Sequence, residues 1–251
     1  MLLFKIIIAP VLIALVSLAG KRWGHGVSGW LLGLPLNSGP ILVFMVLQQG
    51  HSFASAAAIG SLLGIVAWAA FGFVYALCCP RLAWWASMLA GWAAYGLVAL
   101  LLLPVHLGVG WSFMLVAAAL STMLLMFPGP AGNDSVSPTR KYELWLRMLT
   151  ASVMVVTLTG VAKALGPQRS GILTAFPAYT TILAVFSHQQ SAASAVKVMR
   201  GVNMGLYTAA VFFLVLSPCL VRMGAVLAFS LALAAALLVQ GVSLVFVRKN
   251  A

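Results

Sequence analysis

The chain has 251 residues, of which 63% are hydrophobic and only 6% are charged, and its mean hydropathy is +1.12. Soluble domains carry roughly 45–50% apolar and about 25% charged residues, so this composition excludes a soluble globular domain and indicates an integral membrane protein. The apolar runs are ~20 residues long, as a membrane-spanning helix requires, and they lack the alternation of barrel strands. We therefore expect an all-α, polytopic membrane protein.

Basic residues outnumber acidic ones by 14 to 2, which gives a formal net charge of +12. In a membrane protein, loop anchors that face anionic lipid headgroups explain such a surplus. Membrane lipid is therefore an expected partner, and nucleic acid is not.

Nine hydrophobic segments predict nine membrane-spanning helices. In chain order they cover residues 2–19, 27–48, 53–79, 82–103, 105–127, 143–165, 170–190, 193–217 and 223–247. The first segment has features of a signal peptide. However, Lys5 and Ala9 align with Arg147 and Ala151 of an internal segment, so we expect it to remain in the protein. A polar loop, PGPAGNDSVSPTRKYE, follows the fifth segment and contains both acidic residues of the chain.

The second and seventh segments are similar in sequence. Residues 28–49 read SGWLLGLPLNSGPILVFMVLQQ, and residues 170–190 read SGILTAFPAYTTILAVFSHQQ. With one offset and a single-residue slip, the identical positions include two serines, two prolines and the closing glutamine pairs: Ser28 and Ser170, Pro35 and Pro177, Gln48-Gln49 and Gln189-Gln190. A repeat this far apart indicates duplication of a whole unit rather than a solenoid.

The repeat divides the chain into three parts. Residues 1–103 form a first four-helix repeat, residues 104–142 a linking span with a polar cytoplasmic loop, and residues 143–251 a second four-helix repeat. Corresponding helices are separated by five crossings, an odd number, so the second copy must insert upside down. Such inverted-topology repeats are typical of secondary transporters.

The loop charges predict the orientation. One face collects Lys21, Arg22, Arg81, Arg140, Lys141, Arg147, Arg248 and Lys249, and the other has Lys5, Lys163, Arg169 and Arg222. The first face should be cytoplasmic, which places the N-terminus outside and the C-terminus in the cytoplasm.

Each copy carries a proline near the middle of its second helix, followed by small or polar residues. The two runs are Pro35-Leu36-Asn37-Ser38-Gly39-Pro40 and Pro177-Ala178-Tyr179-Thr180-Thr181. A lone proline in a membrane helix usually only kinks it, but two at equivalent positions favour discontinuous helices that meet at the midplane. Ser38 or Gly39 can cap a new half-helix with Pro40 in its first turn, and Thr180 or Thr181 can do the same in the second copy.

Half-helix starts expose backbone N–H groups and a partial positive charge, which suit an anionic group. Apart from Glu143 at the first residue of the sixth, no predicted span contains Asp or Glu, so no carboxylate is available inside a span for a cation. We therefore expect a carboxylate, phosphate or sulfonate group to be bound by Asn37, Ser38, Gly39, Tyr179, Thr180 and Thr181. No cofactor is expected, and no His, Cys, Asp or Glu spacing predicts a metal site.

The eighth segment carries two basic residues, Lys197 and Arg200, where the first copy has Ala56 and Ile59. Charges at membrane depth are functional hypotheses by default, although snorkelling to the headgroups is an equal alternative. With His188, Gln189 and Gln190 at the end of the seventh segment, they predict a cationic cytoplasmic mouth. His188 is also the candidate titrating group near the path, against the alternative of a polar residue at a helix end.

Three further patterns have simpler interpretations. Cys78, Cys79 and Cys219 fall at opposite membrane faces and cannot form a bridge between these faces. Gly60-xxx-Gly64 and Gly201-xxx-Gly205 indicate close helix packing. Residues 26–29, GVSG, resemble the GxSG nucleophile motif of rhomboid intramembrane proteases, but the duplication already explains Ser28 and Gly29.

The SGxLxxFP…VFxHQQ run resembles a class of bacterial inner-membrane proteins built from paired four-helix units. The resemblance implies the bacterial inner membrane but no particular substrate, and Leu47 stands where the second copy has His188. The resulting hypothesis is a secondary transporter or facilitator for a small organic anion or an anionic lipid headgroup. The alternatives are a non-transporting membrane subunit or scaffold and, more remotely, an intramembrane hydrolase; a homo-oligomer stays open.

Overall fold

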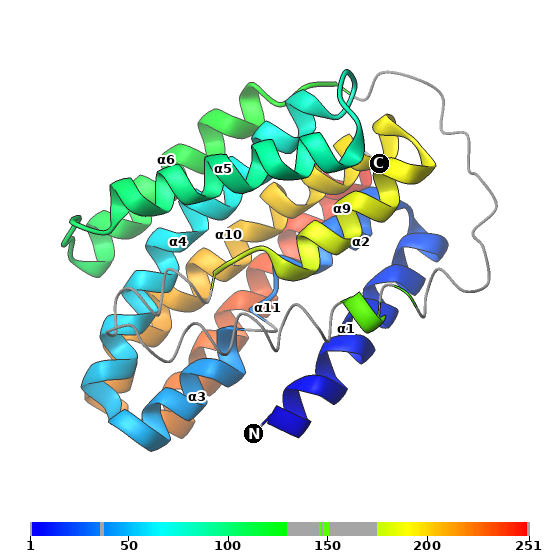
Figure 1. Cartoon of the computed structure of the whole chain (residues 1–251). Helices are drawn as coiled ribbons and strands as arrows, with labels where there is room; N and C mark the ends of the chain where they lie inside the picture. Colours follow the sequence, from blue (N-terminus) through cyan, green and yellow to red (C-terminus); the bar gives the residue numbers. More distant parts are fainter. Residues whose placement is uncertain (1, 36–37, 130–145, 147, 151–174, 250–251) are drawn as a thin grey trace.

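The computed structural model describes residues 2–35, 38–129, 146, 148–150 and 175–249 (Figure 1). All regular secondary structure in these residues is helical. The helices are α1 (Leu2–Trp23), α2 (His25–Leu31), α3 (Ser38–Gln49), α4 (His51–Cys78), α5 (Trp84–Leu102), α6 (Val109–Leu125), α9 (Ala178–Gln190), α10 (Ala192–Met223) and α11 (Ala225–Lys249). The predicted all-helical class is confirmed for this part of the chain.

Four of the described helices are long and apolar enough to cross a membrane: α4, α5, α10 and residues Ala225–Leu244 of α11. Large apolar side chains remain exposed on the outer helices, such as Trp111 and Leu125 of α6 and Leu238 of α11. A soluble monomer rarely exposes so much apolar surface, whereas lipid covers it in a membrane. The molecule is therefore a helical membrane protein.

The tight reversals between consecutive helices depend on glycine. Gly50, between α3 and α4, has a φ of 85°, and Gly224, between α10 and α11, has a φ of 77°. A side chain disfavours this left-handed conformation, so these two residues allow each helix to end and the next to start within one residue.

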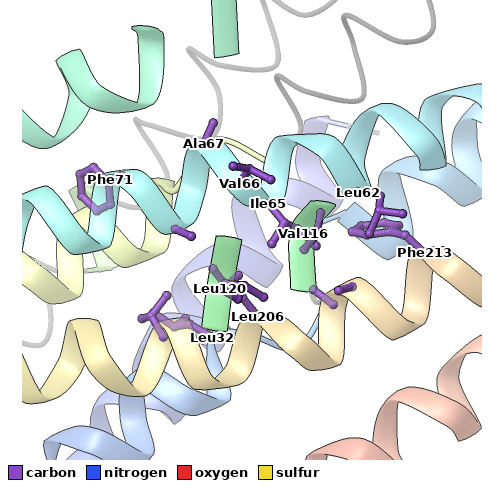
Figure 2. Close-up of a cluster of buried hydrophobic side chains, with 14 of the residues drawn as sticks. Leu32, Leu62, Ile65, Val66, Ala67, Phe71, Val116, Leu120, Leu206 and Phe213 are labelled. Atoms are coloured by element: carbon purple, nitrogen blue, oxygen red, sulfur yellow. The ribbon is translucent and has the colours of Figure 1, made fainter. Parts of the chain in front are cut away.

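The core lies between α4 and α10. Figure 1 shows these two helices crossing the centre of the molecule, and α6 packs against both of them. Figure 2 shows part of this core, with Leu62, Ile65 and Val66 of α4, Val116 and Leu120 of α6, and Leu206 and Phe213 of α10. Further out, α5 packs on α4, while α2 and α11 pack on α10.

α4 and α10 run antiparallel. Near the start of α4, the hydroxyl of Ser55 lies 3.1 Å from that of Ser217, near the end of α10. Just past the other end of α4, the thiol of Cys79 donates to the carbonyl oxygen of Ala192, 3.7 Å away. The three cysteines are free, and this arrangement places Cys219 at the opposite end of the pair from Cys79.

Glycines bring α2 and α10 into backbone contact. A Cβ added at Gly29 would lie 2.1 Å from the carbonyl oxygen of Val198, and one added at Gly201 would lie 2.1 Å from that of Gly26. One turn further along both helices, a Cβ on Gly205 would lie 2.3 Å from the carbonyl oxygen of Trp30. The predicted packing role of Gly201-xxx-Gly205 is confirmed, and α2 runs parallel to α10.

Candidate functional site

The segment predicted as the second span is divided into two helices. α2 ends at Leu31 and α3 begins at Ser38, so the predicted break after Pro35 is confirmed. Ser38 is buried at the first position of α3, the Gly39 amide donates to the Pro35 carbonyl at 2.9 Å, and Pro40 occupies the first turn. Asn37 lies outside the described residues.

The end of α2 is closed by short-range backbone bonds. The amides of Leu32 and Gly33 donate to the carbonyls of Gly29 and Trp30 at 3.0 and 3.1 Å, one residue closer along the chain than in an α-helix. Such bonds tighten the last turn and satisfy carbonyl groups that would otherwise be left without a donor.

A side chain from the far end of the chain completes this end of α2. The buried amide of Gln240 in α11 donates to the Trp30 carbonyl at 3.2 Å, and Thr208 of α10 donates to the Gln240 side-chain oxygen. The Trp30 indole donates to the Ser243 hydroxyl at 2.8 Å. Backbone released by a break in a membrane helix needs such partners, because lipid supplies none. Sequence reasoning missed Gln240; the available signal was an amide inside an apolar segment.

The second proline also directly precedes a helix. α9 begins at Ala178, whose amide donates to the Phe176 carbonyl at 2.8 Å, and the Thr181 amide donates to the Pro177 carbonyl at 2.8 Å. Residues 170–174, in the first part of the predicted span, lie outside the described residues. A helix start directly after Pro177 is confirmed, and a break in this span stays a prediction.

The predicted capping role of Thr180 and Thr181 is wrong. Pro177 is the residue before the first helical position, and the Thr181 hydroxyl donates to the Pro177 carbonyl at 2.8 Å instead of accepting from a free amide. The two threonines therefore lie inside the first turn rather than before it, and their hydroxyls bond elsewhere.

Two tryptophan side chains bind these threonines. The Trp68 indole of α4 donates to the Thr180 hydroxyl at 3.1 Å, and the Trp92 indole of α5 donates to the Thr181 hydroxyl at 3.2 Å. Both threonines are almost fully buried. The sequence signal for this contact was the mid-span position of both tryptophans, since belt tryptophans lie at the interfaces.

Aromatic rings continue this cluster around the start of α9. Phe176 packs edge-on against Tyr95 at 5.1 Å between ring centroids and lies 5.9 Å from the Trp92 ring. Tyr179 is half-buried and packs beside Ile182. Of the predicted substrate contacts in the second copy, Tyr179 is therefore the most accessible.

The two breaks face different neighbours. A Cβ at Gly39 would lie 3.9 Å from the ring of Phe212 in α10, whereas Thr180 and Thr181 face α4 and α5. α2, the helix before the first break, does contact α9. A single site shared by Ser38 and Thr181 stays a prediction.

His188 lies against the end of α4. Its Nδ1 is 3.1 Å from the hydroxyl of Tyr75, and the two rings meet edge-on at 5.8 Å. Together with the Trp68–Thr180 bond, this contact shows that α9 runs parallel to α4. Gln189 is exposed and Gln190 half-buried beyond it.

Lys197 and Arg200 lie on another side of α10. Successive residues of an α-helix are rotated by about 100° around its axis. This rotation places Lys197 and Arg200 between two other residues of α10: Tyr207, which bonds to Ser121 of α6, and Thr208, which bonds to Gln240 of α11. Both are half-buried, and within the described part of the chain the Nε atom of Arg200 is buried without a hydrogen-bond partner. The structure therefore does not gather these two cations around His188.

The remaining candidates have local contacts. The Ser28 hydroxyl donates to the His25 carbonyl at 2.8 Å, and Ser28 is 1% exposed. In the described residues no group of His, Cys, Asp or Glu side chains is arranged to hold a metal ion.

Comparisons with protein-family models, curated proteins and solved structures found no match. The function must therefore be argued from the breaks themselves. Their chemistry is a buried helix start at Ser38, a buried helix start after Pro177, and neutral hydroxyl and amide groups around both.

Proposed function

We propose that the protein is a secondary transporter or facilitator for a small organic anion or an anionic lipid headgroup. The observation that carries the proposal is the interruption between Leu31 and Ser38, inside a helical membrane bundle. An interrupted membrane helix is tolerated where it lines a cavity or is buried in protein, and transporters use such breaks to bind solutes.

The chemistry of the breaks favours an anion. The first amides of α3 and α9 lack partners within their own helices, and each helix start carries a partial positive charge. The expected contacts Asn37, Ser38, Gly39, Tyr179, Thr180 and Thr181 are neutral and polar. To bind the solute, Gly39, Thr180 and Thr181 would have to exchange their present hydrogen bonds for it. Pro35, Pro40 and Pro177 disfavour a continuous helix through these segments, because proline has no backbone N–H to donate to the preceding turn.

The helix directions support an inverted repeat of four spans with a linking span. The third helices of the two copies, α4 and α10, run antiparallel. α2 runs with α10 and α9 runs with α4, so the second helices of the two copies are antiparallel as well. The inverted fold, the bacterial inner membrane and a cytoplasmic C-terminus belong to the same proposal.

Cysteine accessibility tests the proposal. In a variant without Cys78, Cys79 and Cys219, single cysteines at Ser38 and Tyr179 are treated with membrane-impermeant thiol reagents from each side. A water-filled path predicts labelling at both, slowed by inorganic phosphate, sulfate or a short dicarboxylate. Leu206→Cys in the core should stay unreactive, and His106→Cys, exposed in the turn before α6, should react from one side only.

The alternative is a non-transporting membrane subunit or scaffold. The observation that favours it is that the polar side chains at the start of α9 already have partners within the protein. The Trp68 and Trp92 indoles donate to the hydroxyls of Thr180 and Thr181. If neither Ser38→Cys nor Tyr179→Cys reacts from either side, the breaks are packed kinks and the scaffold function replaces transport.

A further inference from the structure

His188 and Tyr75 form a polar pair inside the bundle. Tyr75 is fully buried on α4, its hydroxyl lies 3.1 Å from His188 Nδ1, and the ring planes are inclined at 78°. His188 is half-buried, so one edge of its ring is shielded by the phenol while the residue keeps some exposure at the end of α9.

Two helices end beside this histidine. His188 lies in the last turn of α9, and Tyr75 lies in the last turn of the parallel helix α4. The last carbonyl groups of a helix carry a partial negative charge, which stabilises a cation placed beside them. The start of α10 is also close, but the Ser191 hydroxyl caps it by accepting from the Ser194 amide at 3.0 Å. The local helix ends therefore offer carbonyl groups to an imidazolium, against the cost of burying its charge in the bundle.

No carboxylate is positioned by the sequence to take this role. The acidic residues of the chain are Asp134 and Glu143, and both fall in the polar loop after the fifth predicted span. The titratable groups that the adjoining end of α4 brings toward His188 are Tyr75 and Cys79, whereas Lys197 lies on another side of α10. Among these side chains, only an imidazole ordinarily changes charge between about pH 5 and 8.

The geometry points to the His188–Tyr75 pair as a proton-binding site, and to the proton as the coupling ion of the proposed transporter. This inference rests on the proposed function for its role in transport, but not for proton binding itself. In the neutral pair the Tyr75 hydroxyl donates to Nδ1. When Nδ1 takes up a proton, its new N–H donates to the phenol oxygen, and the phenol proton must turn to another acceptor.

Asn203 of α10 supplies a buried acceptor close by. Asn203 is fully buried, its amide nitrogen donates to the Met199 carbonyl at 3.1 Å, and in the described part of the chain its Oδ1 has no hydrogen-bond partner. It packs at Gly72, one turn before Tyr75, where an added Cβ would lie 2.8 Å from its amide nitrogen. Long side chains on a helix lean toward its N-terminus, and this turn lies on the N-terminal side of Tyr75. A buried polar atom without a partner is costly, so Oδ1 would accept the phenol proton after a shift of the Tyr75 side chain toward it.

Solid-state NMR of the full chain, labelled with ¹⁵N-histidine and reconstituted in lipid bilayers, tests proton binding directly. His188→Asn identifies the His188 signal, which we expect to change protonation state within the pH range over which the reconstituted protein stays folded. Tyr75→Phe, which removes only the hydroxyl, should move its midpoint by roughly half a pH unit or more, the size that loss of one hydrogen bond produces. The matched control, Tyr207→Phe, removes a hydroxyl that bonds to Ser121 instead and should leave the midpoint unchanged.

A His188 signal that keeps one protonation state over this range, or a midpoint that Tyr75→Phe leaves in place, would overturn the proton site. Coupling is tested by the labelling rate of Ser38→Cys at two pH values, each divided by the rate of the exposed reference His106→Cys at the same pH, because the thiolate fraction of any cysteine itself changes with pH. We expect this ratio to differ by about threefold or more between the two pH values and to lose this dependence in His188→Gln. A ratio that ignores pH in both backgrounds overturns coupling and leaves the transporter intact. A Ser38→Cys that never labels removes the proposed function, while the NMR titration still decides the proton site.

Discussion

Trp68 of α4 donates its indole N–H to the hydroxyl of Thr180, 3.1 Å away in the first turn of α9. Trp92 of α5 makes the equivalent bond to Thr181 at 3.2 Å. Together these bonds attach the helix start after Pro177 to two neighbouring helices. A motion of α9 against α4 and α5 would have to break both bonds.

Trp68→Phe should destabilise the protein by about 0.5–2 kcal/mol, since it leaves the buried Thr180 hydroxyl without its donor. Thr180→Val removes the other partner and should cost a similar amount. The double variant should cost less than the sum of the two, because neither partner is then left unpaired. Unfolding by denaturant in mild detergent measures all three.

Trp111→Phe is the control for this cycle, because Trp111 is 73% exposed on α6. It should change stability little. Additive losses in the Trp68–Thr180 cycle would show that the hydrogen bond contributes nothing beyond the packing of the two side chains.

Gly201→Ala should prevent α2 and α10 from packing as they do. The new methyl group would lie 2.1 Å from the backbone oxygen of Gly26, and backbone cannot move aside as a flexible side chain can. Overpacking of this kind costs typically 1–3 kcal/mol, and here we expect the upper end. The loss should be visible in thermal unfolding of the detergent-solubilised protein.

Two other glycines provide a matched control. Nothing lies within 4 Å of a Cβ added at Gly96 of α5 or Gly241 of α11, so Gly96→Ala and Gly241→Ala should be neutral or stabilising by up to about 1 kcal/mol. If Gly201→Ala behaved like these two, the close crossing of α2 and α10 would be wrong.

The sequence predicted the local features well because their causes are local. Apolar runs of ~20 residues require helices in lipid, and proline followed by small residues interrupts one of them at Pro35 and precedes a helix start at Pro177. The Gly201-xxx-Gly205 spacing likewise predicted a close contact, although not that its partner is α2.

The contacts that sequence reasoning missed join residues far apart in the chain. The sequence predicts Thr180 or Thr181 as a helix N-cap, because threonine often caps helices. In the structure, two indoles from other helices donate to the hydroxyls of these threonines instead. Gln240 supports the end of α2 from 210 residues away, and no local pattern indicates which backbone group needs it. The hypothesis that Lys197 and Arg200 join His188 ignored which sides of α10 face α4 and α2.

Gln240→Leu should weaken the end of α2, because the Trp30 carbonyl and the Thr208 hydroxyl both lose a partner in an apolar surrounding. Hydrogen bonds between membrane helices average about 0.6 kcal/mol and reach ~1.7 kcal/mol, so we expect a loss of about 1–2 kcal/mol in unfolding free energy. Gln240→Leu combined with Thr208→Val should recover part of this loss. A further loss in the double variant would mean that the hydroxyl of Thr208 already has another partner.

A disulfide can test the antiparallel pairing of α4 and α10. The hydroxyl oxygens of Ser55 and Ser217 are 3.1 Å apart, so cysteines at these positions in a variant without native cysteines should bridge under mild oxidation. The bridge should appear as a mobility shift that a reductant reverses. The control pairs Ser55→Cys with Asn203→Cys, which lies about four turns from Ser217 along α10 and should not react. If Ser55→Cys bridged to the control position and not to Ser217→Cys, α10 would be shifted along α4, and the helix directions would no longer support an inverted repeat.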